Sequence, residues 1–179
     1  MPFDQKLEIP EPEYDDPKEV FAFFGLAAYA AQVLERGVLF LALELHLNNA
    51  ESVTERDIDS LLGGLESRTL GQVIAAIRQM GFPSNLLEER LAEALARRNE
   101  LAHQFFWDHA EYFMTKGGRV CMIDKLRSLT ATFQEADVET EKTLFEVSKC
   151  TGFTQEAVNR EFAKLKARLH GESEAETLR

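Results

Sequence analysis

The chain has 179 residues, which suits one domain with its own hydrophobic core, and its 45% hydrophobic content excludes wholesale disorder. Its formal net charge of −11 favours solubility and argues against broad, non-specific nucleic-acid binding, which depends on neutralising phosphates. No apolar run reaches the length of a membrane span, and the acidic N-terminus has no secretory signal pattern, so we expect a cytoplasmic protein.

Residues 1–15 are predicted to form an extended acidic arm, followed by a single helical domain over 16–170 and a frayed tail over 171–179. The first helix is expected to begin with an N-cap at Asp16 and a proline at its first position, and to run to about Leu47. Its inner side is apolar at helical spacing, through Val20, Phe23, Phe24, Ala27, Ala31, Leu34, Val38, Leu41 and Leu45.

Glycine pairs and capping residues divide the middle of the chain. The pair 63–64 is expected to end a short helix over 55–62. Thr69 opens a capping-box pattern for a helix to about Met80. Ser84 is expected to cap a long central helix that runs to Lys116 and is closed by the glycine pair 117–118.

A further helix is predicted over 119–150, with an acidic middle at 134–142 that is either a break or a solvated stretch. Thr154 caps a last predicted helix over 155–169. No stretch shows the sustained alternation of a β-strand. The sequence therefore predicts an all-α antiparallel helical bundle with an extra C-terminal helix.

The central helix carries polar residues where its pattern calls for leucine. One apolar line at three- and four-residue spacing comprises Leu87, Leu91, Ala94, Leu101 and Phe105. Arg98 falls in the gap of this line, and Asn99 and His103 fall on a neighbouring apolar line. We therefore expect these three side chains to face inward, where ionisable groups are costly unless they are paired or hydrogen-bonded.

The six residues from Arg98 to His103 place a polar residue directly after an arginine and four residues between that arginine and a histidine. This pattern, late in a long helix of a small bundle, resembles the signature of HEPN domains, and Arg97 and the pair 105–106 fit it too. The resemblance spans about residues 17–150, but its specific part is the hexad.

The resemblance implies a homodimer that brings two copies of the motif together at a shared cleft. Many HEPN proteins are metal-independent endoribonucleases of toxin–antitoxin, defence or RNA-processing systems, and others are binding or dimerisation modules that cleave nothing. It thus implies Arg98, Asn99 and His103 as catalytic residues, with RNA or a cognate antitoxin or regulatory protein as partner.

General chemistry supports the same assignment. Metal-free RNA cleavage needs a 2′-hydroxyl to be activated, phosphorane charge to be stabilised and the leaving oxygen to be protonated. A histidine such as His103 suits the proton transfers, and the forked guanidinium of Arg98 suits the phosphate. Arg90 and Arg97 are the candidate substrate-binding cations. One chain offers a single histidine to this chemistry, so a second copy would supply the other.

Two alternatives of another class stay open. The arginine, asparagine and histidine can form a polar network that ties helices together without catalysis. Residues 148–162 also resemble a helix-turn-helix, which suggests a transcriptional regulator, and the mannitol operon repressor family is similar in its arginine–histidine spacing.

Cysteine and histidine spacing points to no metal site. His103 and His109 are six residues apart, which does not place them on one helical face, so no metal or other cofactor is expected. Cys121 and Cys150 are far apart in sequence and are expected to be reduced and partly buried.

Overall fold

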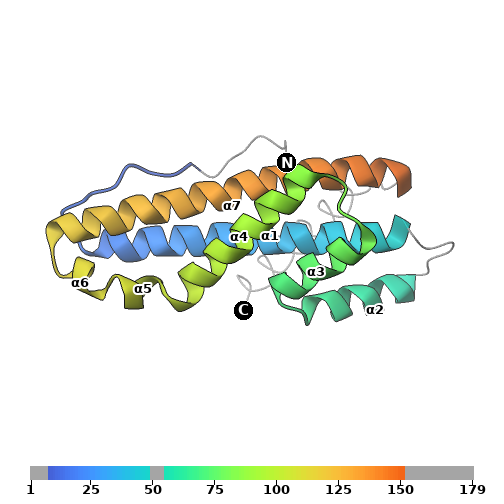
Figure 1. The fold of residues 1–179 in the computed structure, drawn as a ribbon, viewed down its shortest axis with the longest axis horizontal. Helices are drawn as coiled ribbons and strands as arrows, with labels where there is room; N and C mark the ends of the chain where they lie inside the picture. The colour runs from blue at the N-terminus through green and yellow to red at the C-terminus, as the bar shows by residue number, and fades with distance from the viewer. Residues whose placement is uncertain (1–7, 49–54, 152–179) are drawn as a thin grey trace, which may run out of the picture.

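The computed structural model describes residues 8–48 and 55–151, and this part of the chain is all-α, with seven helices and no strand (Figure 1). The all-α prediction is confirmed. The helices are α1 (Lys18–Asn48), α2 (Glu55–Glu66), α3 (Leu70–Met80), α4 (Asn85–His103), α5 (Phe105–Asp108), α6 (Ala110–Phe113) and α7 (Lys116–Thr151).

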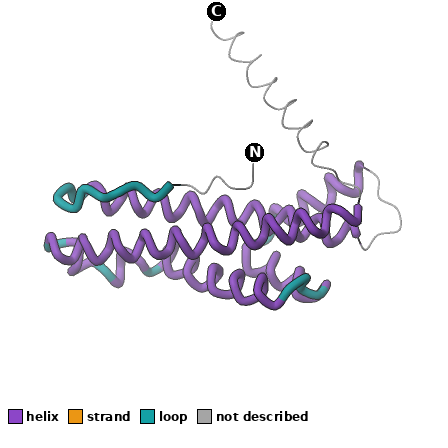
Figure 2. The backbone as a smooth tube through the Cα atoms, turned by 90° about the horizontal axis from the view of Figure 1, so that it is seen from above, coloured by secondary structure: helices purple, strands orange, loops and turns teal. Residues whose placement is uncertain are grey.

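The two longest helices, α1 and α7, lie side by side and run in the same direction (Figures 1 and 2). Lys116, at the start of α7, forms an ion pair with Asp15, just before α1. At the other end, Asn48 Nδ2 donates to the carbonyl of Val147 at 3.4 Å. The long helices are therefore parallel to each other, which the sequence pattern of an antiparallel bundle did not anticipate.

Helix α4 crosses the long pair and runs antiparallel to α7 (Figure 1). Arg90, near its start, pairs with Glu135 at 2.8 Å, and Glu100, near its end, pairs with Lys125. Residues further along α4 therefore contact residues nearer the start of α7. Helices α2 and α3 cover the C-terminal end of α1. The five helices from α2 to α6 together return the chain to the N-terminal end of α1, where α7 begins.

The core is built from the apolar faces that the sequence pattern predicted. On α4, for example, Leu87, Leu91, Ala94 and Leu101 are all buried. Of the described helices, only α1 is long and apolar enough to cross a membrane by length and composition. The inner residues of α1 lie in the core of the bundle.

Local capping chemistry sets several helix starts as predicted. The Asp16 carboxylate accepts from the backbone N–H of Lys18 at 2.8 Å. Thr69 forms a complete capping box with Gln72 at the start of α3, and the Ser84 hydroxyl accepts from the N–H of Leu87 at 3.1 Å. Each of these bonds satisfies an N–H group that a helix start would otherwise leave unpaired.

Two predicted helix ends were wrong. Helix α2 continues through the glycine pair 63–64 to Glu66, because the extra turn buries Leu65, which is only 2% exposed. The central helix ends at His103 rather than Lys116. The backbone of Gln104 leaves the helical region, and the following turn places Phe105 in the core.

The glycine pair 117–118 begins a helix instead of ending one. It lies in the first turn of α7, where the Thr115 hydroxyl accepts from the N–H of Gly118 at 3.0 Å. A Cβ on Gly118 would collide with the backbone of Tyr112 in α6, whereas a Cβ on Gly117 would meet nothing. The requirement at Gly118 is therefore close approach between helices, not termination.

The acidic stretch 134–142, predicted as either a break or a solvated stretch, is a continuous part of α7. Cys121 is a free, exposed thiol, so its predicted partial burial was wrong. The helix predicted over 155–169, most of the helix-turn-helix-like segment 148–162 and the tail 171–179 lie outside the described residues, as does the side chain of Cys150.

Candidate functional site

Arg98, Asn99 and His103 lie in the last two turns of α4. The buried leucine face of α4 orients this end of the helix against α1 and α7. Because side chains three and four positions apart share a helical face, the direction of that buried face decides where the candidate residues point.

Arg98 is half-buried and is held by α1. Its Nε donates to Oε1 of Glu35 at 2.7 Å, and about one third of each side chain is exposed, 32% and 31% respectively. Its Nη1 also donates to Oδ1 of Asn99 at 3.4 Å, a long contact. The Glu35 carboxylate therefore fixes the guanidinium at the edge of the bundle, where the Arg98 side chain stays partly exposed.

Asn99 and His103 are exposed, so the prediction that they face inward was wrong. The line of residues on which they lie begins at buried Leu91, is half-buried at Leu95 and then turns out to solvent. The cause is that α4 packs through one narrow row of buried residues. The neighbouring row, to which Asn99 and His103 belong, turns away from α1 and α7 toward the C-terminal end of α4.

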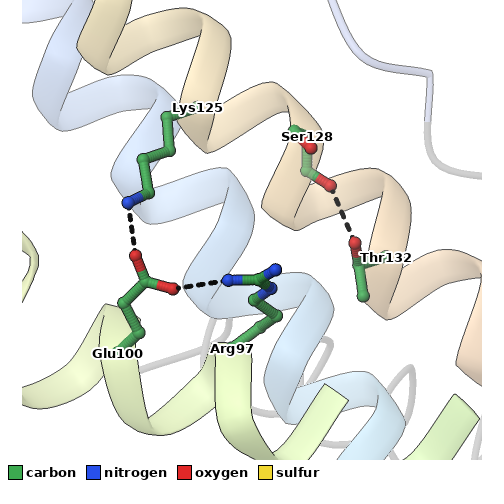
Figure 3. Close-up of polar contacts among 5 residues, drawn as sticks. All are labelled: Arg97, Glu100, Lys125, Ser128 and Thr132. Atoms are coloured by element: carbon green, nitrogen blue, oxygen red, sulfur yellow. Dashed lines mark hydrogen bonds and ion pairs between the residues drawn. The ribbon is translucent and has the colours of Figure 1, made fainter. Parts of the chain in front are cut away.

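Arg97 and Arg90, the candidate substrate-binding residues, are each paired with a carboxylate. Arg97 Nη1 donates to Glu100 Oε2 at 3.1 Å, and the other oxygen of Glu100 pairs with Lys125 of α7, as Figure 3 shows. Hydrogen bonding from Lys125, with a contribution from Arg97, lowers the pKa of Glu100. Arg90 lies two turns earlier and pairs with Glu135.

The structure thus divides the predicted residues into two groups. Arg98 and Asn99 touch each other, and His103 lies one turn further along α4. Arg90 bridges α4 to α7 through Glu135, whereas Arg97 pairs with Glu100 of its own helix, and Glu100 makes the contact with Lys125 of α7. Glu35 is the residue that sequence reasoning missed, although one signal was present: Glu35 and Arg36 interrupt an otherwise apolar stretch of α1.

An exposed aromatic surface includes two residues that follow His103 closely in the chain. Phe105 is buried, but the next two residues turn outward, with Phe106 37% exposed and Trp107 87% exposed. Phe106 stacks on Phe21 of α1 with ring centroids 5.5 Å apart, and Phe21 is itself 55% exposed. We refer to Phe21, Phe106 and Trp107 as the aromatic surface.

The site offers one imidazole for proton transfer, one guanidinium for an anion and one carboxamide for hydrogen bonding. The described residues contain no group of three or more histidine, cysteine, aspartate and glutamate side chains arranged to hold a metal ion. In comparisons with known proteins, no family model, no curated protein and no solved structure matches the chain.

Proposed function

We propose that the protein is a HEPN-like, metal-independent endoribonuclease that acts as a homodimer in the cytoplasm. The observation that carries the proposal is the state of His103. Its side chain is exposed at the end of α4 and makes no hydrogen bond or ion pair with any other described residue, so it is available to exchange protons with a ligand.

In the proposed reaction, His103 of one protomer takes the proton of a ribose 2′-hydroxyl. The 2′-oxygen attacks the adjacent phosphorus, and the bond from phosphorus to the 5′-oxygen breaks. The partner's His103 gives a proton to that leaving oxygen, so the products are a 2′,3′-cyclic phosphate and a 5′-hydroxyl. Arg98 stabilises the phosphorane charge, and Asn99 orients the phosphate.

The proposed dimer uses the aromatic surface. Large aromatic side chains are enriched at protein interfaces, and Trp107 leaves almost all of its ring in solvent in a single protomer. Because α5 follows α4 directly, pairing through Phe106 and Trp107 would bring the two His103 side chains to the same region. One histidine from each protomer then supplies the acid and the base.

A second candidate function is a non-catalytic interaction module, and the ion pairs favour it. Arg90, Arg97 and Arg98 are each paired with a glutamate, and the chain carries a net charge of −11. Paired cations attract phosphate less strongly than free ones. Such a module would bind a regulatory protein or a cognate antitoxin through the aromatic surface.

Cleavage of a mixed RNA pool in EDTA separates these functions. We expect the wild-type protein to cleave and His103→Ala to lose at least ~100-fold of the rate, because proton transfer contributes about 10²–10⁴ to such reactions. Gln104→Ala is the matched control, since Gln104 is the exposed neighbour and makes no side-chain capping bond.

Protein concentrations are set above the dissociation constant of the dimer, and folding is checked by circular dichroism. Cleavage that persists in His103→Ala would rule out His103 as the proton-transfer group. Absence of cleavage by a folded, dimeric wild type would favour the interaction module instead.

A further inference from the structure

A surface cavity of about 270 Å³ lies where α1, α2 and α3 meet. Its volume is near the lower end of ligand-binding clefts, which hold roughly 300–1,000 Å³. The lining combines apolar and charged residues: Gln32, Glu35, Arg36, Leu39, Glu66, Arg68, Leu70 and Val73. Leu39, Leu70 and Val73 are buried core residues, so part of the cavity wall is apolar and rigid.

Of the two arginines that line the cavity, one has no carboxylate partner among the described residues. Arg36 pairs with Glu66 at 2.7 Å, and Glu35 is engaged by Arg98 from α4. The side chain of Arg68 is exposed and forms no hydrogen bond or ion pair within the described part of the chain. Two guanidinium groups, one of them without a carboxylate partner, therefore border a recess with an apolar wall.

We propose that this cavity binds a small organic anion with a phosphate or carboxylate head and a compact apolar body. Arg68 pairs with the head through the planar fork that suits both oxyanions, and Arg36 contributes a second set of donors. The body packs on Leu39, Leu70 and Val73. This binding site does not depend on the RNA-cleavage proposal.

Glu35 connects the cavity to the candidate site. The same carboxylate lines the cavity and holds Arg98. A bound anion is repelled by Glu35 and attracts the Arg98 guanidinium, so neutralising Glu35 should strengthen anion binding. The cavity is therefore positioned to influence how firmly Arg98 is held.

Isothermal titration of the full chain with phenyl phosphate tests the proposal. We expect saturable binding to the wild type, and affinity losses of about tenfold or more in Arg68→Ala and in Arg36→Ala, because each removes a charge-assisted hydrogen bond. A second cavity of about 320 Å³ also borders Arg68 but not Arg36, so the Arg36 variant assigns the binding to the first cavity.

Arg78→Ala is the matched control. Arg78 pairs with Glu88 at 2.8 Å and lies 5.9 Å from the Phe82 ring, whereas Arg36 pairs with Glu66 and lies 5.7 Å from the Phe40 ring. The two arginines share exposure and environment, but Arg78 does not line the cavity. Equal losses in the Arg36 and Arg78 variants would overturn the assignment, as would the absence of binding at millimolar phenyl phosphate.

Three further titrations sharpen the test. Benzoate in place of phenyl phosphate shows which head group is preferred, since the bodies match, and tighter binding of either anion than of phenol supports the site. Phenol binding as tightly as both anions would overturn the requirement for charge. Glu35→Gln is expected to bind the preferred anion more tightly than the wild type, and weaker binding would contradict the role of Glu35.

Discussion

Asp137 of α7 faces Gly37 of α1 across the long helix pair. A Cβ at Gly37 would lie 3.1 Å from Asp137 Oδ1, so the glycine leaves room for the carboxyl group. Burial raises the pKa of Asp137 to about 6, and the nearby Glu141 carboxylate acts in the same direction. A protonated Asp137 therefore suits the folded bundle better than an ionised one.

This residue should make stability fall as the pH rises. A carboxyl whose pKa is higher in the folded state binds more protons there, so its favourable contribution is complete below about pH 4 and is lost as the pH passes 6. We expect Asp137→Asn to raise the unfolding free energy at pH 8 by about 1–2 kcal/mol, a figure reduced for partial exposure.

Urea unfolding at pH 8 and pH 5 measures this effect. The gain from Asp137→Asn should be full at pH 8 and about half as large at pH 5, which lies between the ordinary pKa of an aspartate and the raised one. Glu89→Gln, an exposed change on α4, should be nearly neutral at both. A gain of equal size at both pH values would show that titration of Asp137 is not the cause.

At the scale of elements, the contact between α6 and α7 depends on the absence of a side chain at Gly118. Gly118→Ala is expected to destabilise the protein by at least ~2 kcal/mol, because its Cβ would collide with the Tyr112 backbone. Gly117→Ala should be neutral or stabilising by up to about 1 kcal/mol, since its Cβ meets nothing and the unfolded chain loses freedom. Thermal or urea unfolding of the two variants provides the measurement, and equal effects would contradict the close approach.

Helix starts could be predicted from sequence, whereas the role of the glycine pair 117–118 could not. The caps at Thr69 and Ser84 were predictable because a cap needs only residues two or three positions away. Whether Gly118 ends one helix or permits the approach of another depends on Tyr112, which is a tertiary contact. Helix starts are local chemistry, whereas these helix ends follow from packing.

The sequence proposes which residues form the candidate site, but it does not predict which way they point. The hexad pattern selects Arg98, Asn99 and His103, and a helical wheel places all three of them inward. The structure turns Asn99 and His103 outward, because the buried stripe of α4 is narrower than its apolar pattern suggests. Glu35 could not be paired with Arg98 from sequence, since 63 residues separate them.

For the whole molecule, the proposed dimer predicts that a substitution in the aromatic surface halves the mass of the particle in solution. Trp107→Asp should convert the protein to a monomer, because it places a charge in the centre of an aromatic interface. Its effect on the stability of one protomer should be within about 0.5 kcal/mol, since the side chain is 87% exposed. Sedimentation velocity over a concentration series reports the mass.

Leu86→Asp provides the control for this experiment. Leu86 is 49% exposed at the other end of α4, away from the aromatic surface, and its substitution should leave the dimer intact. A wild type that sediments as a monomer at high concentration, or a Trp107 variant that remains dimeric, would contradict an interface at this surface.

The parallel pairing of α1 and α7 has a consequence for synthesis on the ribosome. The contact between Asn48 and Val147 joins residues 99 positions apart, so α1 is complete long before the helix that covers it exists. In the interval the side of α1 that packs against α7 is open to water and to other nascent chains. We therefore expect the protein to mature late, only after residue 151 leaves the exit tunnel, and to depend on chaperone capture of α1 until then.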